Sequence, residues 1–229
     1  MIIMTTEDTR ELVDGLYRLR TGALLQILAV IVSLIGLVYA ISILGLSIFM
    51  SPQMGLGSIV STIGSIVLVA FISGILMLIG FIYWFMATGN LRNYNPSKLG
   101  IGRTGVTIIV IGLIIALLAI LALAGAVATL PPAGPREPAL LFATTGGFAI
   151  LVLLGLIMVF IGWILFSVML IRLGDLENVS NTIHTAGILY LIGIIVSLVP
   201  YLTVIGEILI LIAVILIYTG AGESLNRIR

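Results

Sequence analysis

The sequence contains no cysteine and a single histidine. Without cysteine there can be no disulfide bonds, thiolate metal sites or cysteine nucleophiles, and the redox compartment stays open. Charged residues are also scarce, at 8% of the chain, and the net charge of +1 provides no basic footprint for a nucleic acid. Hydrophobic residues, in contrast, make up 61% of the 229 residues. A chain of this composition cannot bury its apolar surface in a water-soluble fold, so we expect an integral membrane protein.

Catalytic and metal-binding motifs are missing as well. Gly57-Ser58 lacks the Gly-x-Ser-Gly context of an intramembrane serine nucleophile, and Asp175 has no second membrane aspartate to pair with. No cluster of histidine, aspartate and glutamate has the spacing of metal ligands, and no glycine-rich phosphate loop precedes a basic residue. We therefore expect a protein that is not an enzyme and that needs no cofactor.

One short motif occurs three times, each time where polar sequence gives way to an apolar run. It consists of a basic residue, a threonine and a small residue. Its copies are Arg20-Thr21-Gly22, Arg103-Thr104-Gly105 and His184-Thr185-Ala186. We interpret this pattern as an internal repeat, and the three basic residues as a candidate ring on the inner face of the membrane. The ring would anchor the helices at the interface or bind anionic headgroups.

Small residues recur nine and thirteen positions after each basic residue. They are Ala29 and Ser33, Gly112 and Ala116, and Gly193 and Ser197. Small residues four apart share one helix face and allow another backbone to approach closely in a membrane. We expect a helix-packing seam at which the three helices that carry the motif touch near the bilayer midplane; the alternative is that these residues line a central path.

The apolar runs predict helices over about 21–50, 58–88, 104–130 and 144–172, separated by turn and proline signals. Residues 1–20 are expected to form a separate amphipathic helix, whose leucine stripe lies on the cytoplasmic surface or docks a partner. Residues 21–229 form a single transmembrane domain. The aromatic residues of 81–85 are typical of a belt at the membrane interface.

The last apolar run, 185–221, is too long for one helix across a core of ~30 Å and contains Pro200 near its middle. We divide it into helices at about 185–199 and 203–220, although a re-entrant hairpin or one kinked helix is also compatible with it. Six spans with both termini cytoplasmic place one basic residue, Arg136, outside. The inner segments then hold Arg10, Arg18, Arg20, Arg92, Lys98, Arg103, Arg172, Arg227 and Arg229. This distribution follows the positive-inside rule, whereas five spans would send Arg227 and Arg229 outside.

The predicted fold is an all-α integral membrane protein with six transmembrane helices in three parallel hairpins, over about 21–88, 104–172 and 185–220. Parallel hairpins are related by an axis along the membrane normal, which suggests a pseudo-threefold bundle. Pro200 follows Ser197 after only three residues, so we expect the third hairpin to stop short and to leave an outward-facing notch.

Two single residues are candidates for chemistry. Glu207 is the one acid inside an apolar run, and it is a candidate solute or ion site or an interfacial carboxylate near a helix start. His184 replaces arginine in the third motif and is either an interfacial basic residue or a pH-sensitive gate, because histidine titrates near neutrality.

Residues 15–24, with the sequence GLYRLRTGAL before an Ile/Leu/Val/Gly run, and residues 98–105, KLGIGRTG, carry a family resemblance. They resemble the corresponding segments of an uncharacterised family of multi-pass membrane proteins from thermophilic crenarchaea. The resemblance implies an archaeal cell membrane, and it brings no assigned activity and no catalytic or binding residues.

The expected function is therefore a structural or complex-assembly role in the archaeal cell envelope. We expect the protein to be homo-oligomeric, in contact with membrane lipids or other membrane proteins, and not with nucleic acid. The alternative is a channel or facilitator for a small solute or ion, through the bundle or along an oligomer axis. In that case Glu207 would lie at the outer mouth and the three basic residues at the inner mouth.

Overall fold

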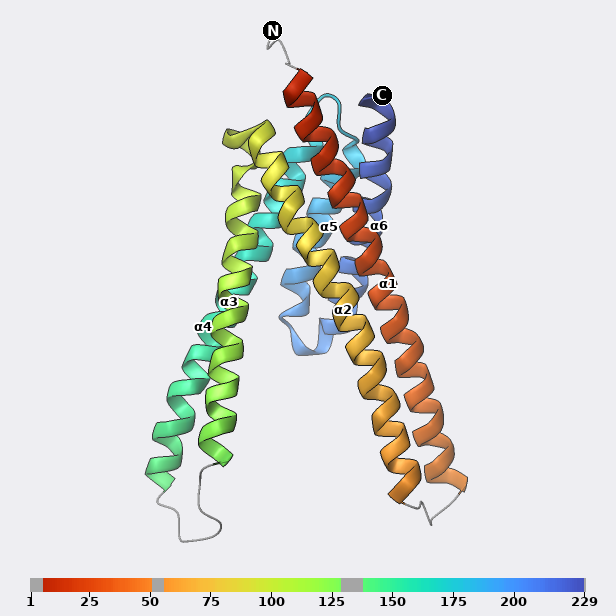
Figure 1. Ribbon diagram of the computed structural model, residues 1–229, viewed down its shortest axis with the longest axis vertical. Coiled ribbons are helices and arrows are strands. Elements are labelled where there is room, and N and C mark those ends of the chain that lie inside the picture. The colour runs from red at the N-terminus through yellow and green to blue at the C-terminus, as the bar shows by residue number, and fades with distance from the viewer. Residues whose placement is uncertain (1–5, 51–55, 129–137, 229) are drawn as a thin grey trace.

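The computed structural model describes residues 6–50, 56–128 and 138–228, and this part of the chain is built from helices (Figure 1). Their order is α1 Thr6–Met50, α2 Leu56–Tyr94, α3 Pro96–Ala128, α4 Pro138–Gly174, α5 Asn181–Ser197, the short 3-10 helix η1 Pro200–Leu202, and α6 Thr203–Ile228. The six expected helices are present. Arg136, Arg229 and the predicted turn between the first two helices, at 51–53, lie outside the described residues.

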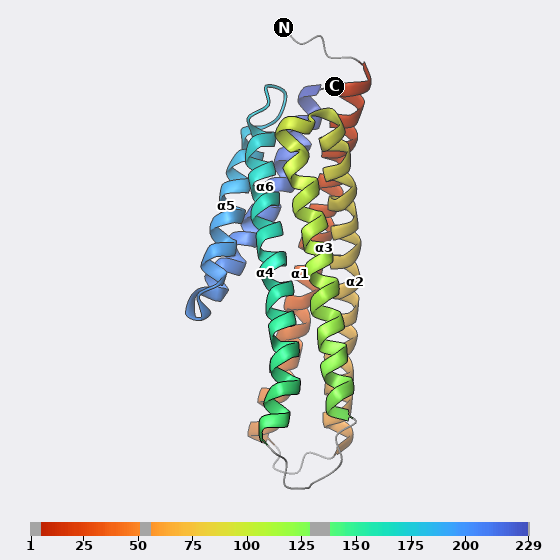
Figure 2. The same cartoon turned by 90° about the vertical axis from the view of Figure 1, so that its left-hand side faces the viewer.

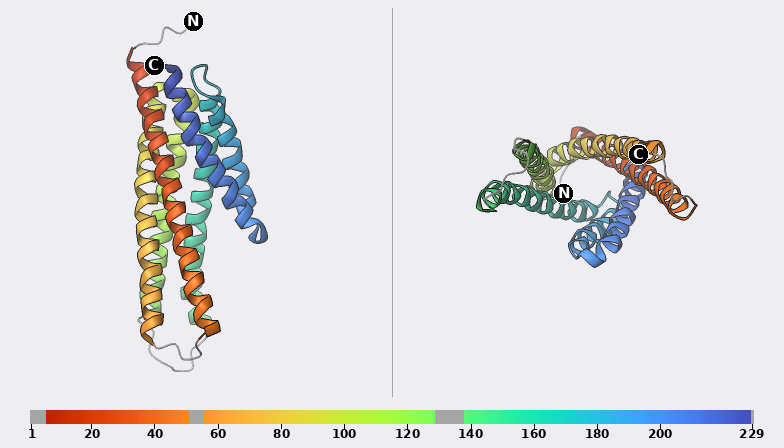
Figure 3. Two further views of the ribbon diagram at one scale, coloured as in Figure 1. Left: turned by 90° about the vertical axis from the view of Figure 1, so that its right-hand side faces the viewer. Right: turned by 90° about the horizontal axis from the view of Figure 1, so that it is seen from below.

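The helices form three hairpins that close into a ring. α1 packs on α2, α3 on α4 and α5 on α6; α2 also contacts α3, α4 contacts α5, and α6 contacts α1. The start of α1, the α2–α3 and α4–α5 connections and the end of α6 lie at one end of the bundle, which we name the terminal end (Figure 1). The view along the bundle shows the helices arranged around a common centre (Figure 3).

The expectation of a separate amphipathic helix before residue 21 is wrong, because α1 runs unbroken from Thr6 to Met50. The leucine stripe does not lie on a membrane surface. Leu12, Leu16 and Leu19 are at most 2% exposed and belong to the hydrophobic core. No proline between residues 6 and 21 interrupts the helix. Because the leucine stripe is buried against the other helices, residues 6–20 continue in the same helix as the transmembrane segment that follows them.

The segment 90–103, which separates the predicted helices 58–88 and 104–130, is also helical apart from Asn95. Asn95 ends α2 and begins α3: its side-chain oxygen accepts hydrogen bonds from the Lys98 backbone N–H at 3.1 Å and from the Ser97 hydroxyl at 2.9 Å. Pro96 then occupies the first position of α3, where a missing N–H costs nothing. α4 likewise begins at Pro138, before the predicted entry at residue 144.

The third hairpin is shorter than the other two, as Figure 2 shows. α5 has 17 residues, whereas α1, α2, α3, α4 and the segment Pro200–Ile228 are long and apolar enough to cross a membrane. Five of the six predicted transmembrane helices are therefore long and apolar enough to be candidate spans, and α5 is apolar but shorter. The 185–221 run is not one kinked helix, because α5 and α6 pack on each other after the turn at 198–202.

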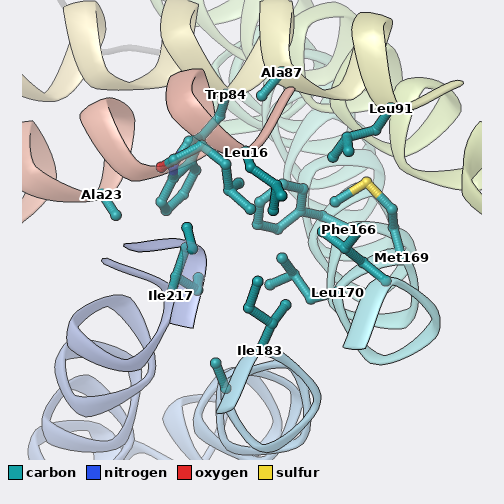
Figure 4. Packing of buried hydrophobic residues seen from close by; sticks show 14 of the residues in the cluster. Leu16, Ala23, Trp84, Ala87, Leu91, Phe166, Met169, Leu170, Ile183 and Ile217 are labelled. Atoms are coloured by element: carbon teal, nitrogen blue, oxygen red, sulfur yellow. The ribbon is translucent and has the colours of Figure 1, made fainter. Parts of the chain in front are cut away.

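The buried core lies in the half of the bundle nearer the terminal end. Trp84 of α2, Phe166 of α4 and Ile217 of α6 are at most 2% exposed and point toward one another, with Leu16 and Ile183 beside them (Figure 4). All three hairpins thus contribute to one core. Large apolar side chains on the outer faces of the helices are exposed, as expected of surfaces that contact lipid.

Candidate functional site

A cavity of about 730 Å³ lies at the terminal end, beside the connection between α2 and α3. Its lining combines three arginines, two asparagines and a few apolar residues. These are Arg18, Phe85, Met86, Gly89, Asn90, Arg92, Asn93, Pro96 and Arg103. Residues of the last turns of α2 form most of the wall, because α2 continues past Gly89 instead of ending there. Among the residues that the structure describes, no aspartate or glutamate lines the cavity.

Arg103 is fixed against the wall of this cavity by α2. Its guanidinium lies over the Phe85 ring, 3.5 Å from the ring centroid, and donates a hydrogen bond of 2.6 Å to the Phe85 carbonyl. Arg18 approaches from α1, and its guanidinium is 3.5 Å from the Asn90 side-chain oxygen. Arg92 is exposed. In the part of the chain that the structure describes, none of these arginines makes an ion pair with a carboxylate.

Arg20, the first residue of the predicted basic ring, lies between α1 and α6 and not at the cavity. Its guanidinium donates a hydrogen bond of 3.2 Å to the Tyr218 hydroxyl and lies 4.8 Å from the centroid of the Tyr218 ring. The buried Arg20 Nε has no hydrogen-bond partner. Arg20 therefore joins the first hairpin to the third.

His184, the third predicted member, lies at the junction of α4 and α5. Its Nδ1 is 2.9 Å from an Asp175 carboxylate oxygen, and both side chains are partly exposed. The three basic positions thus reach three different neighbours, and the structure brings only Arg103 to the cavity. Whether Arg20, Arg103 and His184 act together at the inner membrane face stays a prediction.

The small residues of the predicted seam do lie at close helix contacts, but with other partners than expected. A side chain at Gly112 would meet the Gly155 carbonyl of α4 at 2.6 Å, and one at Gly193 would meet the Gly206 carbonyl of α6 at 3.0 Å. Among the described residues, α1, α3 and α5 contact even-numbered helices and not one another. The expectation that they touch near the midplane is wrong, because in the second and third hairpins the small-residue faces of α3 and α5 pack against α4 and α6, the partners within the same hairpin.

The other members of the predicted seam differ in how deeply they are buried. Ala29 is fully buried and Ala116 is 7% exposed, next to Gly155 of α4. Ser197 is half-buried and its backbone lies against Gly206, whereas Ser33 is exposed. Ser33 therefore lies off the packed face of α1, whereas Gly36, three residues later, is buried against Val69 of α2.

Glu207 lies on an exposed position in the second turn of α6 and does not line the cavity. Its assignment as a solute or ion site stays a prediction. Among the described residues, no group of three histidine, aspartate or glutamate side chains could hold a metal ion.

An aromatic cluster at the centre of the core was not anticipated. Trp84 stacks on Phe166 with ring centroids 5.1 Å apart, and Trp163 and Tyr190 pack at the edges of the same group. The Trp84 indole N–H donates a 3.2 Å hydrogen bond to the Leu19 carbonyl. The interpretation of 81–85 as an interfacial belt is therefore wrong for Trp84, which is 2% exposed. Periodicity alone does not tell a lipid-facing aromatic from a buried one.

A polar lock at the start of α5 was also missed. Ser180 is the N-cap of α5: its hydroxyl accepts from the Thr182 backbone N–H at 3.2 Å and donates to a Glu223 carboxylate oxygen. The Ser180 backbone N–H donates to the Ser224 hydroxyl at 2.8 Å. A serine directly before a helical segment is a strong N-cap, so Ser180 could have indicated this start. The predicted helix begins at about residue 185, four residues after the observed start at Asn181.

One protein family matches this sequence, and its model covers residues 12–229. The chain belongs to the DUF973 family, whose members are proteins of unknown function. The match extends over nearly the whole of this DUF973 protein, from within α1 to the end of α6, and confirms the expected membership of an uncharacterised family. No curated protein and no solved structure matches the sequence. With five helices suited to crossing a membrane, this member of the family is a multi-pass membrane protein.

Proposed function

We propose that this DUF973 protein is a non-enzymatic structural or assembly component of the cell membrane, built as a closed helical bundle. The aromatic core carries the proposal. Trp84, Phe166 and Ile217, from the three even-numbered helices, fill the centre with side chains that are at most 2% exposed. A water-filled path through one subunit would have to pass this group, and it contains no charged side chain.

The charge distribution favours the same function over ion-coupled transport. Ionisable groups near the midplane of a bundle mark ion and proton pathways in membrane proteins. Here the arginines Arg18, Arg20, Arg92 and Arg103 gather at the terminal end, and Glu207 faces outward on α6. A channel would then have to run along the axis of an oligomer, where Glu207 could face a neighbouring subunit.

The three hairpins are proposed to be copies of one repeat with pseudo-threefold symmetry. In the first hairpin, a side chain at Gly22 would meet the Gly80 carbonyl at 2.8 Å, and Trp84 follows four residues later. In the second, a side chain at Gly105 would meet the Gly162 carbonyl at 2.7 Å, and Phe166 follows four residues later. Equivalent glycines and equivalent aromatic residues in two hairpins support a common ancestor, with the third copy shortened.

The basic residues of the three motifs support the same symmetry. Arg20 of α1 contacts α6, Arg103 of α3 contacts α2, and His184 of α5 lies against Gly174 at the end of α4 and pairs with Asp175 just after it. Each reaches the last helix of the hairpin that precedes it in the ring. They are proposed to fasten adjacent hairpins at the cytoplasmic face, with both termini on that side.

If the protein has a structural role, we expect it to form homo-oligomers. The mass of the intact complex gives the number of subunits. Native mass spectrometry of the protein in mild detergent is expected to show multiples of the 24.3 kDa chain. Chemical cross-linking in the membrane before extraction should give the same multiple. A single 24.3 kDa species in both experiments would contradict homo-oligomerisation.

A further inference from the structure

We propose that the cavity at the terminal end binds a phosphate group, presented either by a lipid headgroup or by a free phosphate ion. The proposal rests on the convergence of Arg18, Arg92 and Arg103, from three different helices, on one cavity that has no carboxylate among its described lining residues. It is independent of the structural role proposed above, because a scaffold and a channel could both carry such a site.

The cavity has an excess of positive charge that an anion would neutralise. Three guanidinium groups keep their positive charge at any physiological pH and repel one another across a shared, partly buried space. In the described structure, the ion pairs that could neutralise them are absent: the salt bridge found there joins His184 to Asp175 at another junction. A bound anion would convert this repulsion into attraction.

The hydrogen-bonding groups select a tetrahedral oxyanion. A guanidinium presents five N–H donors in a planar fork that matches the oxygens of a phosphate group. The Phe85 carbonyl takes one bond from Arg103 and the ring supports its flat face, so the guanidinium is held in one orientation. Asn90 and Asn93 add amide groups to the same wall. A preorganised cluster of donors lowers the entropic cost of binding.

The position of the cavity suits both sources of phosphate. It lies where the apolar stretches of α2 and α3 meet the polar connection around Asn95, which is the level of lipid headgroups for helices that cross the membrane. Basic pockets between transmembrane helices bind anionic headgroups there. The volume of about 730 Å³ also admits a phosphate ion with its water.

The test compares three variants of the full chain in nanodiscs of zwitterionic lipid. Arg18→Gln and Arg92→Gln each remove one cavity charge, while Arg227→Gln removes an exposed charge of α6 at the same end of the bundle. Arg92 is the most informative position because it is exposed and carries no core packing. The probes are inorganic phosphate, followed by calorimetry, and phosphatidic acid doped into the disc, followed by native mass spectrometry.

Wild type is expected to bind at least one of the two probes, and each cavity variant to weaken that binding about five- to tenfold, the loss of one charge-assisted contact. Arg227→Gln should bind as wild type does. Binding of phosphatidic acid alone identifies a lipid site; binding of inorganic phosphate identifies a site for the free ion.

Circular dichroism must show wild-type helix content for every variant. Failure of the wild type to bind either probe would overturn the proposal. Equal weakening by Arg227→Gln would overturn it too, because the effect would then come from the net charge of the surface.

Discussion

Trp84 links the hairpins at the scale of a single residue. Its ring stacks on Phe166 of α4, lies beside Tyr190 of α5, and its indole N–H is bonded to the Leu19 carbonyl of α1. One side chain of α2 therefore contacts all three hairpins. Lipid provides no hydrophobic drive for helices to associate, so such packing and hydrogen bonding carry much of the association energy.

Replacement of this ring should therefore be costly. Trp84→Ala is expected to lower the free energy of unfolding by about 3–5 kcal/mol, through lost packing and the remaining cavity. The measurement is thermal unfolding in detergent, followed by circular dichroism. Tyr201→Ala is the control, since Tyr201 is 96% exposed and should change stability by less than about 0.5 kcal/mol. Equal effects of the two substitutions would refute a central role for Trp84.

Gly112 provides a second residue-scale test, of the close α3–α4 contact. The Gly155 carbonyl lies 2.6 Å from the position of a Cβ at Gly112, so even Gly112→Ala forces the backbones apart. We expect a loss of about 1–3 kcal/mol in the same unfolding experiment. Gly74→Ala is the matched control: a Cβ there meets nothing within 4 Å, and the helix propensity should rise. A stabilised Gly112→Ala variant would argue against this contact.

At the scale of helices, the start of α5 depends on polar contacts with the end of α6. Ser180 caps α5 and contacts both Glu223 and Ser224, which fixes the third hairpin at its terminal end. The opposite end is fixed by the approach of Gly206 to Gly193 and Ser197. A short hairpin with little length for packing thus has contacts at both of its ends.

Loss of the cap should open the first turn of α5 before the rest of the bundle. Ser180→Ala removes a hydrogen-bond acceptor worth about 1 kcal/mol at an N-cap, so amides near Thr182 should exchange about fivefold faster. Hydrogen–deuterium exchange with mass spectrometry measures this. Thr219→Ala is the control, because its hydroxyl bonds carbonyls of its own helix. Unchanged exchange in Ser180→Ala would contradict the proposed lock.

The sequence predicted the number of helices and their pairing better than their ends. Long apolar runs and proline signals are local, so α1 to α6 could be placed from them. Helix ends at residues 6, 94 and 96 depend on tertiary burial and on the Asn95 cap, which no hydropathy pattern records. Helical spacing correctly predicts that Leu12, Leu16 and Leu19 form one apolar stripe. It does not show that the stripe packs in the core of the bundle and not on the membrane surface.

The candidate site was less predictable still. Arg20 and Arg103 were singled out from the motif, yet Arg18 and Arg92, which join Arg103 at the cavity, belong to no repeated pattern. They converge because α2 extends past Gly89 and turns directly into α3. Such a site depends on the spatial arrangement of three helices, which spacing along one helix cannot supply.

At the scale of the whole molecule, the parts of the chain at the terminal end should face one side of the membrane. These parts are the α2–α3 connection, the α4–α5 connection and the end of α6. Because the chain has no cysteine, Ser97→Cys, Asp175→Cys and Asn226→Cys each provide a single label site. A membrane-impermeant maleimide applied to sealed vesicles should react with all three or with none, and detergent should make all three reactive. Labelling of Ser97→Cys and Asn226→Cys from opposite sides would contradict the hairpin arrangement.

The most direct test of a closed bundle is ion conduction. Purified wild type in planar bilayers or liposomes is expected to give no conductance or solute flux above that of protein-free membranes, because Trp84, Phe166 and Ile217 fill the centre. Glu207→Gln, measured beside it, should give the same result. Reproducible wild-type conductance that Glu207→Gln alters would contradict the structural role and establish a channel in its place.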